Sequence, residues 1–412
     1  MSQTNSQPLS LADGLQPQNL ANPYPLYEQL RESGPVYWDE RVGGWTVTGY
    51  AEVAALLRDG RLSASRFMID TSWIPEGARE YLEPTARALS RQMLFRDPPD
   101  HTRLRMLVAK AFTPRMVEQL RPTITQIANE LLDKAEGSGQ MELMREFAYP
   151  LPAIVIATML GVPPEDRDQF NRWSQHFGSL LDGGDYTMEG LFEAMVGVTE
   201  FIAYFRDMIH KRRTTPKDDL MQALIDAEER GDALNEDELL GNCVLLLAAG
   251  HGTTMHLIGN GTLALLRNPE QRNLLQKHLD DPAFLSLAVA ELLRYESPVQ
   301  MTSRNARESL EIGGKQVQAG QEVILCLGAA NRDPAQFHDP DRLNLGRPEN
   351  KHLAFGLGIH FCLGAPLARL EGEIAFSTLF RRFPHLRLAT EEVEWLQSLV
   401  FRGLKELPVA LA

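Results

Sequence analysis

A glycine-rich decapeptide around one cysteine is the segment of this chain best suited to carry out chemistry. It runs from Phe355 to Gly364 (FGLGIHFCLG) and ends where a helix is predicted, with Pro366 in the first turn of that helix. Its glycines permit tight turns and a close approach of the backbone to a flat ligand. A helix N-terminus stabilises negative charge and lowers the pKa of a nearby thiol. The pattern therefore predicts that Cys362 is presented as a thiolate, whereas a lone cysteine without these neighbours is more often simply buried.

The whole decapeptide resembles the haem-binding loop of the cytochrome P-450 family, F-x-x-G-x-x-x-C-x-G. The resemblance implies that Cys362 is the thiolate ligand of the iron of haem b, a ligand that pushes electron density onto iron and favours O–O cleavage. It also implies that Phe355 packs near the ligand sulfur and that His360 hydrogen-bonds a haem propionate. Gly356 and Gly364 complete the cofactor-binding positions of the loop.

Two other segments resemble the family's propionate-binding residues. Haem carries two carboxylates, and cations or histidine donors suit each of them. His101 and Arg105 are spaced i,i+4 and so share one face of a predicted helix, and Arg304 matches the family's second propionate arginine. Taken alone, His101 is more often a surface residue beside basic neighbours. Together with the cysteine loop, the resemblance assigns all three side chains to the haem.

The centre of the longest predicted helix, residues 236–267, resembles the family's oxygen-binding motif A-G-x-[D/E]-T-[T/S]. Ala249 and Gly250 would leave room above the haem, and Thr253 matches the alcohol that hydrogen-bonds dioxygen. Gly252 stands where the family has an acid that helps relay protons. This departure leaves open an engineered change, proton supply by substrate or water, or a peroxide-driven or rearranging reaction.

Three further residues are predicted to form the family's buried ion-pair network. Glu291 and Arg294 fit the motif E-x-x-R, but the same spacing occurs elsewhere in the chain, so the spacing alone is uninformative. Arg342, in the tetrapeptide PDRL, resembles the arginine of the family's P-E-R-F element. The resemblance implies a Glu291–Arg294–Arg342 cluster, in which the loss of one member would leave a buried charge unpaired.

The family resemblance also predicts which residues line the substrate pocket. The stretch 62–95, expected to be a loop, would roof the substrate, and most of the predicted positions are apolar. Such a lining favours a medium-to-large lipophilic substrate. Each position is equally compatible with plain core packing. The predicted positions are Phe67, Met68, Met93, Leu94, Leu245, Val299, Met301, Thr302, Val400 and Phe401.

Composition narrows the class of protein. The 412 residues carry 41 Lys and Arg against 55 Asp and Glu, a net charge of -14, which argues against nucleic-acid binding and against attraction to anionic lipid. Three cysteines make no disulfide framework and fit a reducing compartment. Neither a signal peptide nor a run of about 18 apolar residues is evident. We therefore expect a cytoplasmic protein without membrane insertion.

The hydrophobic periodicity predicts a mainly α fold with small β-sheets, namely the P-450 fold with a large helical domain and a smaller β-rich lobe. Residues 1–20 are expected to be a flexible arm and residues 21–412 a single domain, with β-rich contributions near 35–50, 310–327 and 385–412. Besides the 236–267 helix, helices are predicted near 51–58, 102–111, 114–135, 151–160, 165–180, 189–213, 217–229, 284–295 and 363–382. An irregular loop is predicted over 333–348.

The resemblance implies a haem-thiolate monooxygenase of secondary metabolism that uses O2 to hydroxylate or epoxidise its substrate. Electrons would come from a separate ferredoxin-type donor, since no flavin or nicotinamide domain follows the cysteine loop, and Arg103, Lys110 and Arg115 could form its basic docking surface. The chain is expected to be a monomer. Because of Gly252, two alternatives stay open: a weak, peroxide-driven or rearranging haem-thiolate enzyme, and a haem-binding ligand sensor or degenerate non-enzyme.

Overall fold

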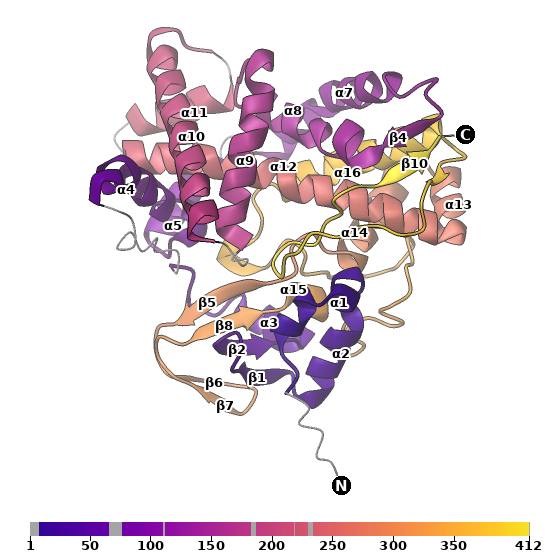
Figure 1. The fold of residues 1–412 in the computed structure, drawn as a ribbon, viewed down its shortest axis with the longest axis horizontal. Coiled ribbons are helices and arrows are strands. Elements are labelled where there is room, and N and C mark those ends of the chain that lie inside the picture. The colour runs from indigo at the N-terminus through magenta and orange to yellow at the C-terminus, as the bar shows by residue number, and fades with distance from the viewer. Residues whose placement is uncertain are drawn as a thin grey trace.

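The computed structural model describes residues 8–65, 76–109, 112–182, 187–217, 219–229 and 234–411. Most helices gather in one large body, and the largest sheet lies beside it together with the N-terminal helices (Figure 1). The predicted division into a helical domain and a smaller β-rich lobe is therefore confirmed. No described helix is long and apolar enough to cross a membrane.

The helices of the described chain have the following bounds. They are α1 Pro17–Ala21, α2 Tyr24–Ser33, α3 Tyr50–Leu56, α4 Glu76–Ser90, α5 Asp100–Ala109, α6 Pro114–Gln119, α7 Arg121–Asp133, α8 Pro150–Met159, α9 Arg167–Asp182, α10 Met188–Thr214, α11 Leu220–Glu229, α12 Glu236–Arg267, α13 Pro269–Lys277, α14 Pro282–Tyr295, α15 Leu327–Ala330 and α16 Ala365–Arg382. The strands are β1 Val36–Asp39, β2 Gly44–Val47, β3 Leu62–Ser63, β4 Gln140–Glu142, β5 Thr302–Ala306, β6 Leu310–Ile312, β7 Lys315–Val317, β8 Glu322–Leu325, β9 Arg387–Leu388 and β10 Pro408–Ala410.

The largest sheet joins strands from the N-terminal part of the chain to strands between residues 302 and 325. Its strand order is β1-β2-β8-β5-β3. Strands β1 and β2 form a hairpin in the predicted β-rich stretch 35–50, which turns at Gly43, whose φ of 76° favours glycine. Strand β2 then pairs in parallel with β8, with Trp45 opposite Val323. Strand β5 pairs antiparallel with β8 and places Arg304 opposite Val323. Residues 36–63 and 302–325 therefore form one surface.

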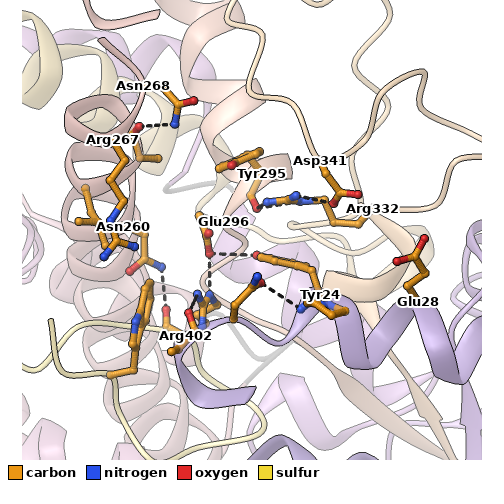
Figure 2. Close-up of a pocket in the computed structure, with 16 residues that line it drawn as sticks. Tyr24, Glu28, Asn260, Arg267, Asn268, Tyr295, Glu296, Arg332, Asp341 and Arg402 are labelled. Atoms are coloured by element: carbon orange, nitrogen blue, oxygen red, sulfur yellow. Dashed lines mark hydrogen bonds and ion pairs between the residues drawn. The ribbon is translucent and has the colours of Figure 1, made fainter. Parts of the chain in front are cut away.

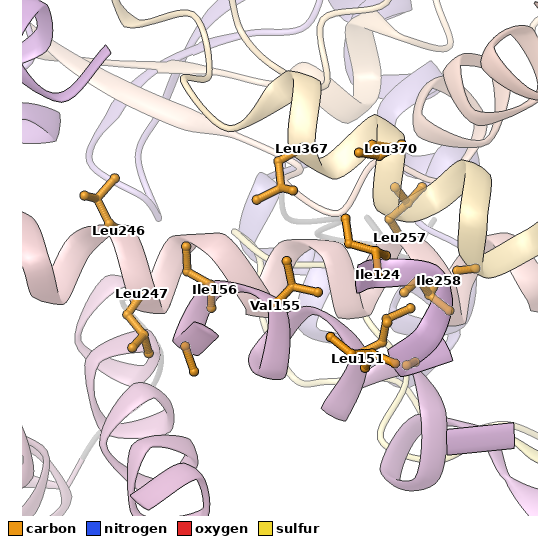
Figure 3. Close-up of a cluster of buried hydrophobic side chains, with 14 of the residues drawn as sticks. Ile124, Leu151, Val155, Ile156, Leu246, Leu247, Leu257, Ile258, Leu367 and Leu370 are labelled. Atoms are coloured by element: carbon orange, nitrogen blue, oxygen red, sulfur yellow. The ribbon is translucent and has the colours of Figure 1, made fainter. Parts of the chain in front are cut away.

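Helix α12 is the centre of the helical body. It begins with a capping box, in which the Asn235 side chain accepts from the Glu238 N–H and the Glu238 carboxylate accepts from the Asn235 N–H. It packs against α8, α16, α4 and α14, so most of its positions are buried. Figure 3 shows apolar side chains of α12 meeting those of α7, α8 and α16. Burial of each such side chain contributes about 1.5–3 kcal/mol.

The structure corrects three of the predicted boundaries. The predicted helix 114–135 is two helices, α6 and α7, with the break just before Pro122. The stretch 62–95 contains helix α4, which was not expected. The flexible arm is wrong for residues 8–20, because Leu11 is buried and the Ser10 hydroxyl donates to the Asp39 carboxylate at 2.7 Å.

The buried ion-pair network contains a different arginine from the one predicted. Glu291 and Arg294 are fully buried and share two hydrogen bonds of 2.8 Å. The third member is Arg347, whose Nε donates to both Glu291 oxygens at 3.2 and 3.0 Å. The prediction of Arg342 was wrong: its side chain is exposed, and its backbone carbonyl accepts from Arg294 and Arg347. Arg294 also donates to the carbonyl of Pro340, so the network fastens the irregular segment that leads to the cysteine loop.

Two matched substitutions separate these arginines. Arg347→Gln removes one of the positive charges that balance the buried Glu291 carboxylate. We therefore expect a loss of about 3–5 kcal/mol in the free energy of unfolding. Arg342→Gln removes an exposed charge and is expected to change that free energy by less than about 0.5 kcal/mol. Urea unfolding followed by far-UV circular dichroism measures both. Equal effects of the two substitutions would contradict this account of the network.

Candidate functional site

The loop before α16 is shaped by two left-handed glycines. Gly356 has φ 66° and Gly358 has φ 73°, values that favour glycine. A Cβ on Gly358 would lie 2.6 Å from the Leu57 carbonyl oxygen, so this glycine also lets the loop pack on the end of α3. The Cys362 N–H donates to the Phe355 carbonyl at 2.9 Å and closes the loop. Cys362 thus stands three residues before Ala365, the first residue of the helix, near the predicted helix start.

Opposing effects act on the Cys362 thiol. Burial raises the pKa of this thiol, whereas the backbone N–H groups of Gly364 and Ala365, together with Arg105 and Arg369, act to lower it. The predicted effect of the helix N-terminus on this pKa is therefore present, but burial outweighs it in the protein alone. A bound metal cation would add the positive charge that deprotonates a coordinating thiol.

The three predicted propionate residues from other segments come together with His360 of the loop. The rings of His101 and His360 lie 4.2 Å apart between centroids. The Arg105 guanidinium donates to the Phe361 carbonyl at 2.7 Å and so ties α5 to the loop. Arg304 from β5 acts electrostatically on both histidines and lowers the pKa of each.

This cluster fits a ligand that carries two carboxylates. His101 Nδ1 and His360 Nε2 are buried and have no hydrogen-bond partner among the described residues. Burial and the positive charge of Arg304 lower the pKa of His360 to about 3, with Asp97 opposing. Asp97 itself is occupied by Arg307 at 2.6 Å. A pair of propionates would accept hydrogen bonds from the two histidine rings and pair with the positive charges of Arg105 and Arg304.

The predicted oxygen-binding motif lies on α12, and two of its residues share one face of this helix. Ala249 is exposed, and Thr253, one turn later, donates from its hydroxyl to the Ala249 carbonyl at 3.1 Å. Gly250 has another role than the one predicted, because a Cβ there would lie 3.0 Å from Ile156 of α8. Its missing side chain therefore lets α8 approach α12. A Cβ on Gly252 would meet nothing within 4 Å.

Comparisons with known proteins decide the family. The sequence matches the cytochrome P450 family over residues 62–399. It is 43% identical over 394 residues to the biotin biosynthesis cytochrome P450 of Bacillus subtilis (strain 168), covering 95% of this chain and 96% of that protein. The chain belongs to the cytochrome P450 family.

Further relatives agree with this result. The 6-deoxyerythronolide B hydroxylase of Saccharopolyspora erythraea is 41% identical over 402 residues, which cover 94% of this chain and 96% of the relative. The crystal structure of P450BioI in complex with hexadec-9Z-enoic acid ligated acyl carrier protein superposes with a TM-score of 0.88 at 41% identity, covering 96% of this chain and all of that chain. The protein is thus a P450 monooxygenase that binds haem b through a cysteine thiolate.

The predicted substrate-pocket residues of this P450 fall into three groups. Met93, Leu245 and Met301 are buried, and Met301 packs among residues of α2 and β8, which favours a core role for it. Partly accessible positions are Leu94, Val299, Thr302, Val400 and Phe401. Of these, Val299 and Phe401 pair in an antiparallel bridge. Phe67 and Met68 lie outside the described residues.

Sequence reasoning missed a buried acid beside the oxygen-binding motif. Glu371 on α16 is buried, and neither of its carboxylate oxygens has a hydrogen-bond partner among the described residues. Burial raises the pKa of Glu371 to about 8, and the nearby Thr254 hydroxyl on α12 acts in the opposite direction. A signal was present in the sequence, because Glu371 follows Leu367 by four residues and precedes Ile374 by three, on the apolar face of the helix.

An acidic side chain at position 252, where the oxygen-binding motif of the family has an acid, would fit this P450 without a steric clash. We expect Gly252→Glu to raise the ratio of product formed to NADH oxidised, since general acid catalysis contributes about a hundredfold or more where it operates. Gly252→Gln is the matched control, because both substitutions relieve the cost of glycine inside a helix by up to about 1 kcal/mol. An equal ratio in the two variants would show that the added acid does not relay protons.

Proposed function

We propose that this P450 inserts one oxygen atom of O2 into a C–H or C=C bond of a medium-to-large lipophilic molecule. Cys362 is the proposed iron ligand, and the haem supplies oxygen activation when it is bound. The propionates are held by His101, Arg105, Arg304 and His360. The observation that carries this assignment is the convergence of these four donors, two of them buried without partners, beside the cysteine loop.

The proposed substrate is a long-chain acyl or polyketide-like compound. One similar structure contains hexadec-9Z-enoic acid linked to an acyl carrier protein, and one relative is a 6-deoxyerythronolide B hydroxylase. The partly accessible positions predicted for the pocket are mostly apolar: Leu94, Val299, Val400 and Phe401. Such a lining favours extended apolar substrates over small polar ones.

A protein side chain other than the missing motif acid is proposed to hold the proton for oxygen activation. With a pKa near 8, Glu371 is neutral at physiological pH and carries a proton on its carboxyl group. Thr254, beside it, follows Thr253 in the chain, so the carboxyl lies next to the oxygen-binding motif. This arrangement supports proton supply from α16 and favours the monooxygenase over a peroxide-driven enzyme or a ligand sensor.

The electron donor is proposed to be a separate ferredoxin-type protein that docks on a monomer. Arg103 contributes less than expected, because it is paired with Glu238 at 2.6 Å. Lys110 lies outside the described residues. Arg115 is exposed, as is Met106 on α5, and Ile359 in the cysteine loop is half exposed. One cation with nearby apolar side chains supports docking near the cysteine loop.

The haem assignment is tested by spectroscopy of the purified protein. The reduced carbon monoxide complex is expected to absorb as a haem-thiolate, and Cys362→His is expected to convert it to an imidazole-type spectrum. Cys243→Ala, at a buried cysteine of α12, is the control and is expected to keep the thiolate spectrum. Palmitoleic acid is expected to cause a low-to-high-spin shift in the wild type. A thiolate spectrum retained in Cys362→His would overturn the ligand assignment, and product formed with peroxide but not with O2 and electron donors would overturn the proposed reaction.

Glu371→Gln tests the proposed proton source with two readouts. The stability that the neutral acid contributes is fully present below pH 4.5 and is lost as the pH rises toward 8, at a cost of up to about 5 kcal/mol. We therefore expect Glu371→Gln to raise stability near pH 8 while lowering the ratio of product to NADH oxidised. Gly252→Glu in the same chain is expected to restore that ratio. Higher stability with an unchanged ratio would limit Glu371 to a structural role.

A further inference from the structure

Asn260 is a buried polar residue of α12 that the proposed reaction does not use. It follows Thr253 of the oxygen-binding motif by seven residues, or two helical turns, so both lie on one face of α12. Its side chain is 1% exposed, and its Nδ2 donates to the backbone carbonyl of Arg402 at 2.9 Å (Figure 2). Its Oδ1 has no hydrogen-bond partner among the described residues. The bond to the C-terminal loop is therefore the polar contact that holds this side chain.

The turn that ends at Arg402 carries Val400 and Phe401, two of the predicted pocket residues. The Arg402 N–H donates to the Pro298 carbonyl at 2.8 Å. The Val400 carbonyl accepts from the Gln300 N–H, also at 2.8 Å. The turn is thus bound edge to edge to the other chain segment that is predicted to line the pocket. A shift of the turn would change the apolar wall that the two segments form together.

The Arg402 side chain anchors the end of this turn. Its guanidinium pairs with Glu296 at 2.6 Å, next to the end of α14. It also donates to the carbonyls of Leu20 and Ala21 at 2.9 and 3.1 Å. These bonds fix the side chain, whereas the backbone carbonyl of the same residue is held by Asn260.

The next residue of the loop, Gly403, lies against the ring of His256, one helical turn before Asn260. A Cβ on Gly403 would clash with this ring, so the missing side chain lets the loop approach α12 closely. The ring is buried, and its Nδ1 has no hydrogen-bond partner among the described residues. His256 and Asn260 together therefore set how far the turn stands from α12, the first by its shape and the second by its hydrogen bond.

A cavity of about 290 Å³ lies beside this contact (Figure 2). Asn260, Arg402, Glu296, Asn22 and Tyr24 are among its lining residues, so a part of its wall is polar. A buried carbonyl without a donor is costly, and a polar cavity of this size has room for water. Without the amide of Asn260, the Arg402 carbonyl would therefore turn toward the cavity and take the backbone of the turn with it.

We infer that Asn260 is a positioning residue that determines how well the pocket holds long apolar ligands. The inference rests on the proposed function, because it takes Val400 and Phe401 as part of the pocket wall. The hydrogen bond to the Arg402 carbonyl keeps the turn, and with it these two side chains, in place. Loss of this bond lets the wall retreat. Ligands that reach the wall then bind more weakly, whereas ligands that stay at the haem iron are unaffected.

A series of 1-alkylimidazoles from methyl to dodecyl tests this inference in the haem-loaded enzyme. The imidazole nitrogen binds the haem iron and shifts the main haem absorption band, and the alkyl chain extends into the pocket. In the wild type, affinity is expected to rise with chain length. Asn260→Leu has a similar volume but no donor. We expect it to weaken dodecylimidazole binding about tenfold, as if roughly two methylene groups left apolar contact, and to change methylimidazole binding by less than about twofold.

Two further variants separate the hydrogen bond from its surroundings. Asn268→Leu is the matched control, because Asn268 lines the same cavity but its amide donates to the Ala264 carbonyl of its own helix at 2.8 Å. It is expected to leave the whole series unchanged. Gly403→Ala pushes the same turn away from His256 and is expected to weaken dodecylimidazole selectively. It keeps the inference testable if Asn260→Leu does not fold.

Three results would overturn the inference. They are equal losses for methylimidazole and dodecylimidazole in Asn260→Leu, no selective loss in either Asn260→Leu or Gly403→Ala, and the same loss in Asn268→Leu. A wild-type affinity that does not rise with chain length would refute the proposed lipophilic pocket together with this inference. The carbon monoxide spectrum of each variant tests the haem ligand separately, so failure of the iron assignment is distinguished from failure of the role of Asn260.

Discussion

The crowding of two arginines and two histidines beside a buried thiol is the constraint on which the site depends. His101, Arg105, Arg304 and His360 come from a helix, a strand and a loop, and the two histidines have depressed pKa values because burial and neighbouring positive charge penalise their protonation. The same surroundings raise the pKa of the Cys362 thiol through burial. A bound haem would compensate for both effects. Its carboxylates would accept hydrogen bonds from the donors, and its iron would bind the sulfur as a thiolate.

Contacts elsewhere in the fold hold the side chains of the site in position. The Glu291 network binds the carbonyls of the irregular segment before the cysteine loop, and Arg105 binds the loop from the other side. The parallel pairing of β2 with β8, followed by β5, brings Arg304 to the site. Each contact joins segments far apart in the sequence, so the site forms only when the helical body and the β-rich lobe are both folded.

Two unusual features, one on α12 and one on α16, are interpreted together. The family's acid is replaced by Gly252, while the buried carboxyl of Glu371 lies on α16, beside Thr254. Burial raises the pKa of Glu371, because desolvation opposes its ionisation and makes the ionised form costly. Its cost to stability and its place next to the oxygen-binding motif are the reasons for assigning it the proton.

The sequence by itself determined the elements and the chemistry of the cysteine loop. The helix 236–267 and the β-rich stretch 35–50 follow from local patterns, and the structure has α12 and the β1–β2 hairpin where they were predicted. The propionate candidates and Thr253 were found through motif resemblance, and their roles stay predictions. Helix α4 was missed, even though helices need only a local pattern.

Only the tertiary structure decided which groups meet. It selected Arg347 over Arg342, because the Arg342 side chain is exposed and only its backbone carbonyl takes part, accepting from Arg294 and Arg347. It placed Gly250 against α8 and buried Glu371 against α12. Such outcomes depend on distances between segments that are remote in sequence, and no local pattern encodes those distances.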